Sequence, residues 1–142
     1  MNKKHDGKRW CAEAEVKVQF YDLDPMNVVW HGNYMKYMEL ARCALFDKIA
    51  YNYEEMQASG YMWPIIDLQI RYAGPAVFNQ HLICRAEIVE WENRLKINYL
   101  IHDAVTGRRL TKATTTQVAV RIASGEMCFV SPPVLLEKLG LQ

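Results

Sequence analysis

Residues 21–42 read YDLDPMNVVWHGNYMKYMELAR, an acidic turn that leads directly into the longest amphipathic helix expected in the chain. From about residue 33 to residue 50, apolar residues recur at helical spacing, namely Tyr34, Met38, Ala41, Leu45 and Ile49. Asn33 is expected to cap this helix, and Glu39 is expected on its polar face beside Arg42. The stretch therefore predicts a helix whose N-terminus, with its unpaired N–H groups, follows an acidic loop.

Two carboxylates, Asp22 and Asp24, occupy the loop before this helix. An Asp before a Pro is common in turns, because its carboxylate accepts hydrogen bonds from the backbone that follows. A carboxylate beside preorganised N–H donors can also attack an acyl carbonyl, or activate water against it, while the donors hold the oxygen that gains charge. The residues alone leave both roles open for Asp24. Asp22 is the competing carboxylate, which can also cap or solvate the loop.

The rest of the chain alternates between apolar and polar residues, a pattern typical of strands with one buried face. Such runs cover residues 16–20, 66–72, 82–88, 94–102 and 110–122. Glu92 and Asn93 are expected to form a tight hairpin, residues 127–130 a last strand, and residues 53–59 and 135–139 short helical segments. One long helix and an antiparallel sheet with a single apolar face predict an α+β fold in which the sheet wraps around the helix.

Length and composition fit one intracellular domain. The 142 residues suit a single domain, which we expect over residues 13–142 after a flexible basic tail over residues 1–12. A net charge of +1 predicts no binding to nucleic acid or anionic membrane, and no apolar run is long enough for a membrane span. The four cysteines show no paired spacing, so we expect reduced thiols in a cytoplasmic protein.

The sequence lacks the marks of several other enzyme classes. Its four histidines and four cysteines show no metal-ligand spacing, so no metal is expected. Neither G-x-G-x-x-G nor a P-loop is present, so no nucleotide cofactor is expected. The absence of a G-x-S-x-G elbow argues against a serine hydrolase of the α/β type.

A strand, Asp-x-Asp-Pro, an apolar pair, an aromatic residue with His, and Asn-Tyr at a helix start resemble the opening of the 4-hydroxybenzoyl-CoA thioesterase branch of the hotdog-fold superfamily. The stretch is also similar to the short-chain acyl-CoA thioesterases associated with the bacterial Tol–Pal system. YAGPA at residues 72–76 resembles the family's aromatic-x-x-Pro-Ala step into the next strand. The resemblance spans about residues 16–130 and implies a hotdog fold, an antiparallel sheet wrapped around one long central helix.

By position, the resemblance implies that Asp24 is the catalytic carboxylate and that the backbone N–H of His31 polarises the thioester carbonyl. The His31 imidazole is the alternative group for that residue, as an acid or base near neutral pH. Tyr34, Met38 and Trp30 are candidates for binding the acyl group, although Met and aromatic residues at helical spacing also form ordinary core.

Two segments depart from the family's pattern. Met26 and Asn27 replace a small pair that often contains Gly, and we expect this change to alter the mouth of the pocket. Residues 79–81 stand where relatives often carry acidic residues, which bears on contacts with the tail of coenzyme A.

The resemblance implies hydrolysis of an acyl thioester, on coenzyme A or on an acyl-carrier protein, to a free acid and a thiol without a cofactor. Two alternatives stay open: a hotdog-fold dehydratase of 3-hydroxyacyl thioesters, and a non-catalytic acyl-binding protein. A sister group of hotdog thioesterases uses a helix carboxylate, for which Glu39 is the candidate.

The resemblance also implies an assembly of several copies. Two chains are expected to join edge to edge into one continuous sheet, through an edge strand such as residues 108–122 or 80–90. Asp24 of one chain would then lie near residues 73–77 of the other. We expect a homodimer or, by packing of the outer sheet faces, a homotetramer.

Overall fold

The computed structural model describes residues 10–141. Its first strand, β1 (Cys11–Lys17), begins inside the tail expected over residues 1–12, and the Trp10 side chain before it is buried in the core. The rest of that predicted tail, residues 1–9, lies outside the described residues. The folded domain therefore includes residues that the sequence assigned to the tail.

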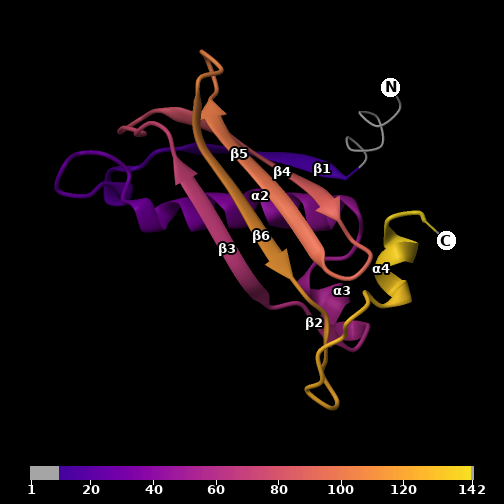
Figure 1. The fold of residues 1–142 in the computed structure, drawn as a ribbon. Helices are drawn as coiled ribbons and strands as arrows, with labels where there is room; N and C mark the ends of the chain where they lie inside the picture. The colour runs from indigo at the N-terminus through magenta and orange to yellow at the C-terminus, as the bar shows by residue number, and fades with distance from the viewer. Residues whose placement is uncertain (1–9, 142) are drawn as a thin grey trace.

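One long helix and a five-stranded antiparallel sheet form the centre of the fold (Figure 1). The sheet has the order β1-β4-β5-β6-β3, with β3 (Ile65–Tyr72), β4 (His81–Glu90), β5 (Leu95–Asp103) and β6 (Arg109–Gln117). The helix α2 (Tyr34–Lys48) continues from a 3₁₀ turn, η2 (His31–Asn33). The smaller elements are η1 (Phe20–Asp22), α3 (Tyr53–Ala58), β2 (Tyr61–Met62) paired with β7 (Val120–Arg121), and α4 (Pro133–Lys138).

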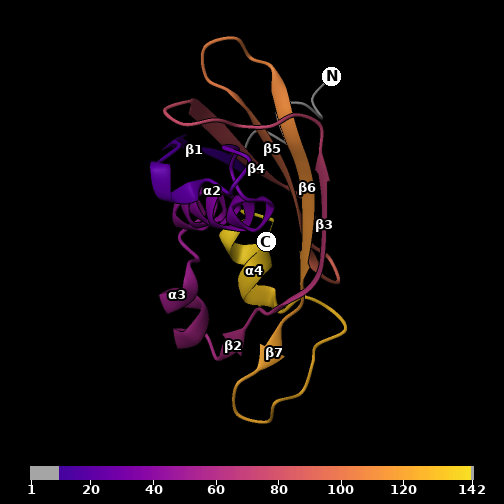
Figure 2. The same cartoon turned by 90° about the vertical axis from the view of Figure 1, so that its left-hand side faces the viewer.

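Alternation along the strands places one face of the sheet against α2 (Figure 2). The inward residues of β4 and β5 are almost fully buried, and they are Leu82, Cys84, Ala86, Ile88, Leu95, Ile97, Tyr99 and Ile101. Met38, Ala41 and Leu45 of α2 are buried to the same degree, because they lie on one stripe of the helix. The predicted hotdog architecture is confirmed.

The two edges of the sheet are β1 and β3, so the edge strands that we expected are wrong. The segments 108–122 and 80–90 contain β6 and β4, and both strands lie inside the sheet. The reason is a crossover between β3 and β4, which follow one another in the sequence but are not neighbours in the sheet. β3 pairs with β6, whereas β4 pairs with β1 on one side and with β5 on the other.

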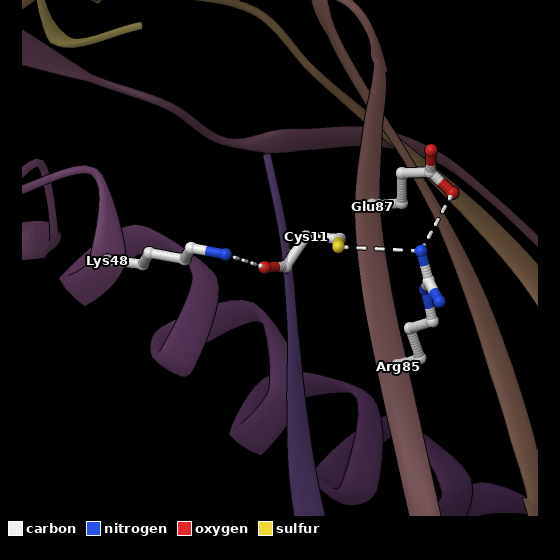
Figure 3. Close-up of polar contacts among 4 residues, drawn as sticks. All are labelled: Cys11, Lys48, Arg85 and Glu87. Carbon is white, nitrogen blue, oxygen red and sulfur yellow. Dashed lines mark hydrogen bonds and ion pairs between the residues drawn. The ribbon is translucent and has the colours of Figure 1, made fainter. Parts of the chain in front are cut away.

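The edge strand β1 is held by polar contacts at Cys11 (Figure 3). Lys48, the last residue of α2, donates from Nζ to the Cys11 carbonyl oxygen at 2.8 Å. Arg85 of β4 donates to Cys11 Sγ at 3.4 Å and lies 3.9 Å from the Glu87 carboxylate. These contacts tie β1 to the helix and to the sheet at once. No disulfide joins any of the four cysteines, all of which lie within residues 10–141.

Arg42 turns inward from α2, which corrects the expected pairing with Glu39. Its side chain is 7% exposed and donates to the Tyr53 and Tyr99 hydroxyls, each at 3.1 Å. The Tyr99 hydroxyl lies 2.8 Å from Thr115 Oγ1. The hydroxyl oxygens offset part of the cost of burying a guanidinium, which stays charged at any physiological pH. Glu39 is exposed.

The strand predicted over residues 127–130 is wrong. This segment contributes one isolated bridge, between Val120 and Met127, and the Phe129 side chain is 79% exposed. An apolar run needs a neighbouring strand to pair with, and the strand nearest to it, β7, is 2 residues long.

Candidate active site

A hollow of about 360 Å³ lies where the start of α2 faces the end of β3. Its lining consists of Asp24, Val28, Val29, His31, Tyr34, Tyr72, Ala73, Gly74 and Pro75. A second hollow, of about 280 Å³, lies over strands β3, β5 and β6, and its lining contains Arg71 and Lys112 but no carboxylate. The first hollow is the candidate active site, because it brings a carboxylate to a helix start.

Asp22 anchors the loop and is only 6% exposed. Its Oδ2 accepts hydrogen bonds from the Gln19 N–H at 2.9 Å and from the Tyr37 hydroxyl at 3.0 Å. Its carbonyl oxygen accepts from the Trp30 N–H at 2.9 Å and from Asn33 Nδ2 at 2.8 Å. Asp22 therefore has a capping role. Asn33 stands at the N-cap position of α2 as expected, but its side chain donates to the loop and makes no capping hydrogen bond to the helix.

Asp24 is partly buried in the wall of the hollow. Its Oδ1 accepts from the Met26 N–H at 2.8 Å and lies 3.5 Å from the Val28 nitrogen. The Asp24 N–H also donates to the Val28 carbonyl at 2.8 Å, which closes the turn. Within residues 10–141, no hydrogen bond engages Oδ2. One carboxylate oxygen thus holds the turn, and the other is available to a substrate or a water molecule.

Asn27 accommodates the departure from the family's glycine-containing pair. Its φ of 66° lies in the left-handed region, which Gly adopts most readily and which Asn tolerates better than most side chains. Met26 beside it is 80% exposed and is not part of the lining of the hollow. The loop therefore keeps its tight turn without a glycine.

The first residues of the helix form another part of the wall. Trp30 is extended, with φ −61° and ψ 135°, and the 3₁₀ turn begins at His31. Within residues 10–141, the backbone N–H groups of His31 and Gly32 have no hydrogen-bond acceptor. Such groups carry the partial positive charge of a helix N-terminus. An oxygen that gains negative charge beside His31 would therefore be stabilised.

Tyr72 is a site residue that the sequence did not single out. Its hydroxyl donates to the His31 carbonyl oxygen at 2.8 Å, across 41 residues of sequence. Its ring centroid lies 5.2 Å from that of Tyr34 and 6.4 Å from that of His31. The available signal was its place at the start of the YAGPA step, which marked a strand end and not a site.

Of the three residues predicted to bind the acyl group, Tyr34 lines the hollow. Burial raises the pKa of its hydroxyl, so this group is protonated at neutral pH and can donate a hydrogen bond. Met38 is 1% exposed and belongs to the core, outside the lining. Trp30 is also outside the lining, and its indole covers Gly32. The acyl-binding role of each residue stays a prediction.

Ala73, Gly74 and Pro75 of the same chain line the hollow, while the expected approach of residues 73–77 from a partner subunit stays a prediction. The N–H groups of Ala73 and Gly74 both donate to the Leu110 carbonyl, at 2.8 and 3.1 Å. The Val29 N–H donates to the carbonyl of the buried Ala76 at 2.9 Å. The hollow is therefore assembled within one chain, at the end of the edge strand β3.

Residues 10–141 contain no group of three or more His, Cys, Asp or Glu side chains placed to hold a metal ion. No helix in the same range is long and apolar enough to cross a membrane.

The sequence profile of the thioesterase-like superfamily matches residues 18–139. The chain therefore belongs to this superfamily, and the resemblance to hotdog thioesterases is confirmed at that level.

Individual relatives are distant. The Bacillus subtilis protein "Putative acyl-CoA thioesterase YneP" is 28% identical over 110 residues, which cover 77% of this chain and 79% of that protein. The crystal structure of the hypothetical protein TT1821 from Thermus thermophilus has a TM-score of 0.80 at 24% identity, over 92% of this chain and 98% of that one. Slr0204 from Synechocystis, a 1,4-dihydroxy-2-naphthoyl-CoA thioesterase, has a TM-score of 0.81 at 17% identity, over 92% and 96%. These two structures support the fold.

Proposed function

We propose that this protein hydrolyses an acyl thioester to a free acid and a thiol. The observation that carries the proposal is the presence of Asp24 and the start of α2 in one hollow, in a chain of the thioesterase-like superfamily. Thioester hydrolysis needs a group that delivers a nucleophile to the carbonyl carbon and donors that stabilise the carbonyl oxygen. Asp24 and the N–H of His31 are suited to these two tasks.

Asp24 can act in two ways, and both use the ionised carboxylate. As a general base, Oδ2 removes a proton from water, and the resulting hydroxide adds to the carbonyl carbon. As a nucleophile, the carboxylate itself adds to that carbon, and loss of the thiolate leaves an acyl–aspartyl anhydride that water then hydrolyses. In each case the carbonyl oxygen becomes negative, the carbon–sulfur bond breaks, and the departing thiolate takes up a proton.

The acyl carrier is proposed to be coenzyme A or an acyl-carrier protein. The Bacillus subtilis relative is named for acyl-CoA, which supports the first of these carriers. Release of thiol from a panel of acyl-CoAs, and from the same acyl groups on a carrier protein, distinguishes the two. The same panel tests the alternatives. Hydration of a crotonyl thioester without thiol release indicates the dehydratase, and tight acyl-CoA binding without either reaction indicates a binding protein.

The main test of the proposal is Asp24→Asn. Asparagine keeps the shape of the side chain and can still accept the Met26 N–H hydrogen bond of the turn. It can serve neither as a base nor as a nucleophile, so we expect kcat for thiol release to fall by at least about a thousandfold. The thermal midpoint should change little, because the turn is preserved.

Two matched variants serve as controls for Asp24→Asn. Asp22→Asn alters the buried capping carboxylate, so its main effect should be on the unfolding midpoint and not on kcat. Glu39→Gln should be mild, because Glu39 is exposed and lies outside the lining of the hollow. An active Asp24→Asn together with an inactive Glu39→Gln would assign the mechanism to the helix carboxylate instead.

A further inference from the structure

The peptide group between His31 and Gly32 is held on two sides. At its carbonyl end, the Tyr72 hydroxyl donates to the His31 oxygen at 2.8 Å. On another side the Trp30 indole packs so closely on Gly32 that even a single Cβ at this position would collide with the ring. The two contacts come from different parts of the chain, since Tyr72 ends the edge strand β3 and Trp30 precedes the helix.

The contact from Tyr72 acts on the peptide group next to the proposed oxyanion donor, the N–H of His31. A hydrogen bond accepted by a peptide carbonyl polarises the whole peptide group and makes its N–H a stronger donor. The N–H of this peptide belongs to Gly32, next to the N–H of His31, and neither has an acceptor within residues 10–141. The same bond also fixes the orientation of the peptide plane, and with it the direction of the neighbouring N–H groups.

We propose that Tyr72 is a positioning residue for thioester hydrolysis. Its hydrogen bond to the His31 carbonyl orients and polarises the backbone at the start of the helix, where N–H groups stabilise the negative oxygen of the tetrahedral intermediate. This inference rests on the proposed function. Tyr72 touches the His31 carbonyl and acts through the backbone, so it is distinct from the catalytic groups Asp24 and His31.

The setting of Tyr72 suits this task. Its ring packs against those of Tyr34 and His31, with centroids 5.2 and 6.4 Å away, which limits the positions of the hydroxyl. Burial raises the pKa of the hydroxyl, so it remains a donor across the neutral and mildly alkaline range. The backbone of Tyr72 is paired with Thr111 of β6, so the sheet holds the donor in place.

The test is Tyr72→Phe, which removes the donor and keeps the ring. Loss of one direct oxyanion donor costs about a hundredfold or more in kcat, so loss of a group that acts through such a donor should cost about tenfold. KM should stay within about twofold, because the interaction strengthens only as charge develops. Tyr61→Phe is the matched control. It removes a tyrosine hydroxyl that accepts from Arg121 at 3.3 Å, outside the lining of the hollow, and kcat should not change.

A spectroscopic measurement separates positioning from a general structural effect. The probe is an acyl-CoA ketone analogue, in which a CH₂ group between sulfur and the ¹³C-labelled carbonyl prevents hydrolysis. In the wild-type complex the carbonyl stretch should shift to lower frequency because donors polarise the bond. In Tyr72→Phe this shift should be smaller, at an unchanged thermal midpoint.

The possible results test the role of Tyr72 and the proposed function separately. An unchanged kcat in Tyr72→Phe, a change confined to KM, or an equal carbonyl shift in both proteins would overturn the role of Tyr72. A wild-type protein that releases no thiol from any thioester would overturn the proposed function, and the carbonyl shift would still decide whether Tyr72 polarises the site.

Discussion

Asp22 and Asp24 stand two residues apart in the sequence, and folding gives them different surroundings. Asp22 is buried outside the lining of the hollow, and its Oδ2 and its carbonyl oxygen each accept two hydrogen bonds from the protein. Oδ1 of Asp24 accepts the hydrogen bonds of the turn, whereas no group within residues 10–141 donates a hydrogen bond to Oδ2. A carboxylate with one committed oxygen and one available oxygen is both oriented and reactive.

For His31, a substitution can distinguish a role of the backbone N–H from a role of the imidazole. If the N–H of His31 is the functional group, His31→Ala keeps it, and kcat should stay within about tenfold of wild type. The pH–rate profile should then show one acidic limb, from a carboxylate, and no second limb in the histidine range. A well-folded but inactive His31→Ala would instead assign the task to the imidazole.

The sequence predicted the place of Asp24 and His31 in the candidate site but not that of Tyr72, because only the first two are close in sequence. Asp24 and His31 lie in one continuous loop, so their neighbourhood could be inferred from a local motif. Tyr72 reaches the same place across 41 residues, through a sheet pairing that alternation does not specify. Met38 lies in the core and outside the lining of the hollow, because helical spacing predicts the inner face of a helix and cannot tell a cavity wall from filled core.

The helix α2 and the strands β3 to β6 were predictable because each follows a single periodicity over many residues. The first strand was placed too late, since β1 covers Cys11–Lys17 and Phe20 of the predicted run 16–20 begins a 3₁₀ turn. The crossover that places β3 beside β6 was not predictable, since a sheet order depends on which apolar faces meet and not on any one strand. Side-chain hydrogen bonds also stabilise the turn that follows β5. Asp103 ends β5, and its Oδ1 accepts the N–H groups of Val105 and Thr106, each at 2.8 Å. Its Oδ2 accepts from Gln80 at 2.7 Å, in the segment that follows the loop of the hollow.

Asp103 predicts how stability changes in acid. The hydrogen bonds from Thr106, Gln80 and Val105 lower the pKa of its carboxyl from 3.8 to about 2. The folded state thus holds the proton less tightly than the unfolded state, so the ionised carboxylate stabilises the fold above pH 4. This contribution should disappear as the pH falls from about 4 to about 2.

The measurement compares urea midpoints of wild type and Asp103→Asn between pH 6 and pH 2. The gap between the two proteins should be full at pH 6 and should narrow progressively below pH 4. Glu13→Gln, at an exposed carboxylate of β1, is the control and should show no such gap. A gap of constant size at every pH would show that the carboxylate charge at Asp103 does not contribute.

At the scale of the whole molecule, β3 leaves one side of the sheet open. It lies at an edge of the sheet, and Ile65, Ile66 and Leu68 on this strand are 42%, 56% and 38% exposed. Unpaired backbone groups beside exposed apolar side chains invite pairing with another strand. We therefore expect the predicted dimer or tetramer to form through β3. The last residue of this strand, Tyr72, borders the candidate site.

The alternation of β3 restricts how two copies can pair. Ile70 packs against the core and Tyr72 contacts His31 on the same side of the sheet, whereas Asp67 and Gln69, which share a hydrogen bond, lie on the other face with Arg71. A two-fold axis perpendicular to the sheet keeps each face on its own side, so an outward residue must pair with an outward residue. An axis through Gln69 then places Asp67 opposite the partner subunit's Arg71, and the reverse, in two symmetric ion pairs. No ion pair joins Asp67 or Arg71 to another side chain within residues 10–141.

Charge exchange tests this pairing. Asp67→Arg and Arg71→Asp should each weaken the dimer, because each places like charges opposite one another at two positions, while the double variant should restore it. Cross-strand pairs are worth about 0.2–1 kcal/mol each, so two pairs should shift the dissociation constant by roughly twofold to thirtyfold. Light scattering during dilution from micromolar protein measures the shift, and Arg94→Gln, which alters a cation already paired with Glu90 at 2.9 Å, should leave it unchanged. A double variant that dissociates as readily as either single variant would rule out this register, and a wild-type monomer at micromolar concentration would rule out assembly through β3.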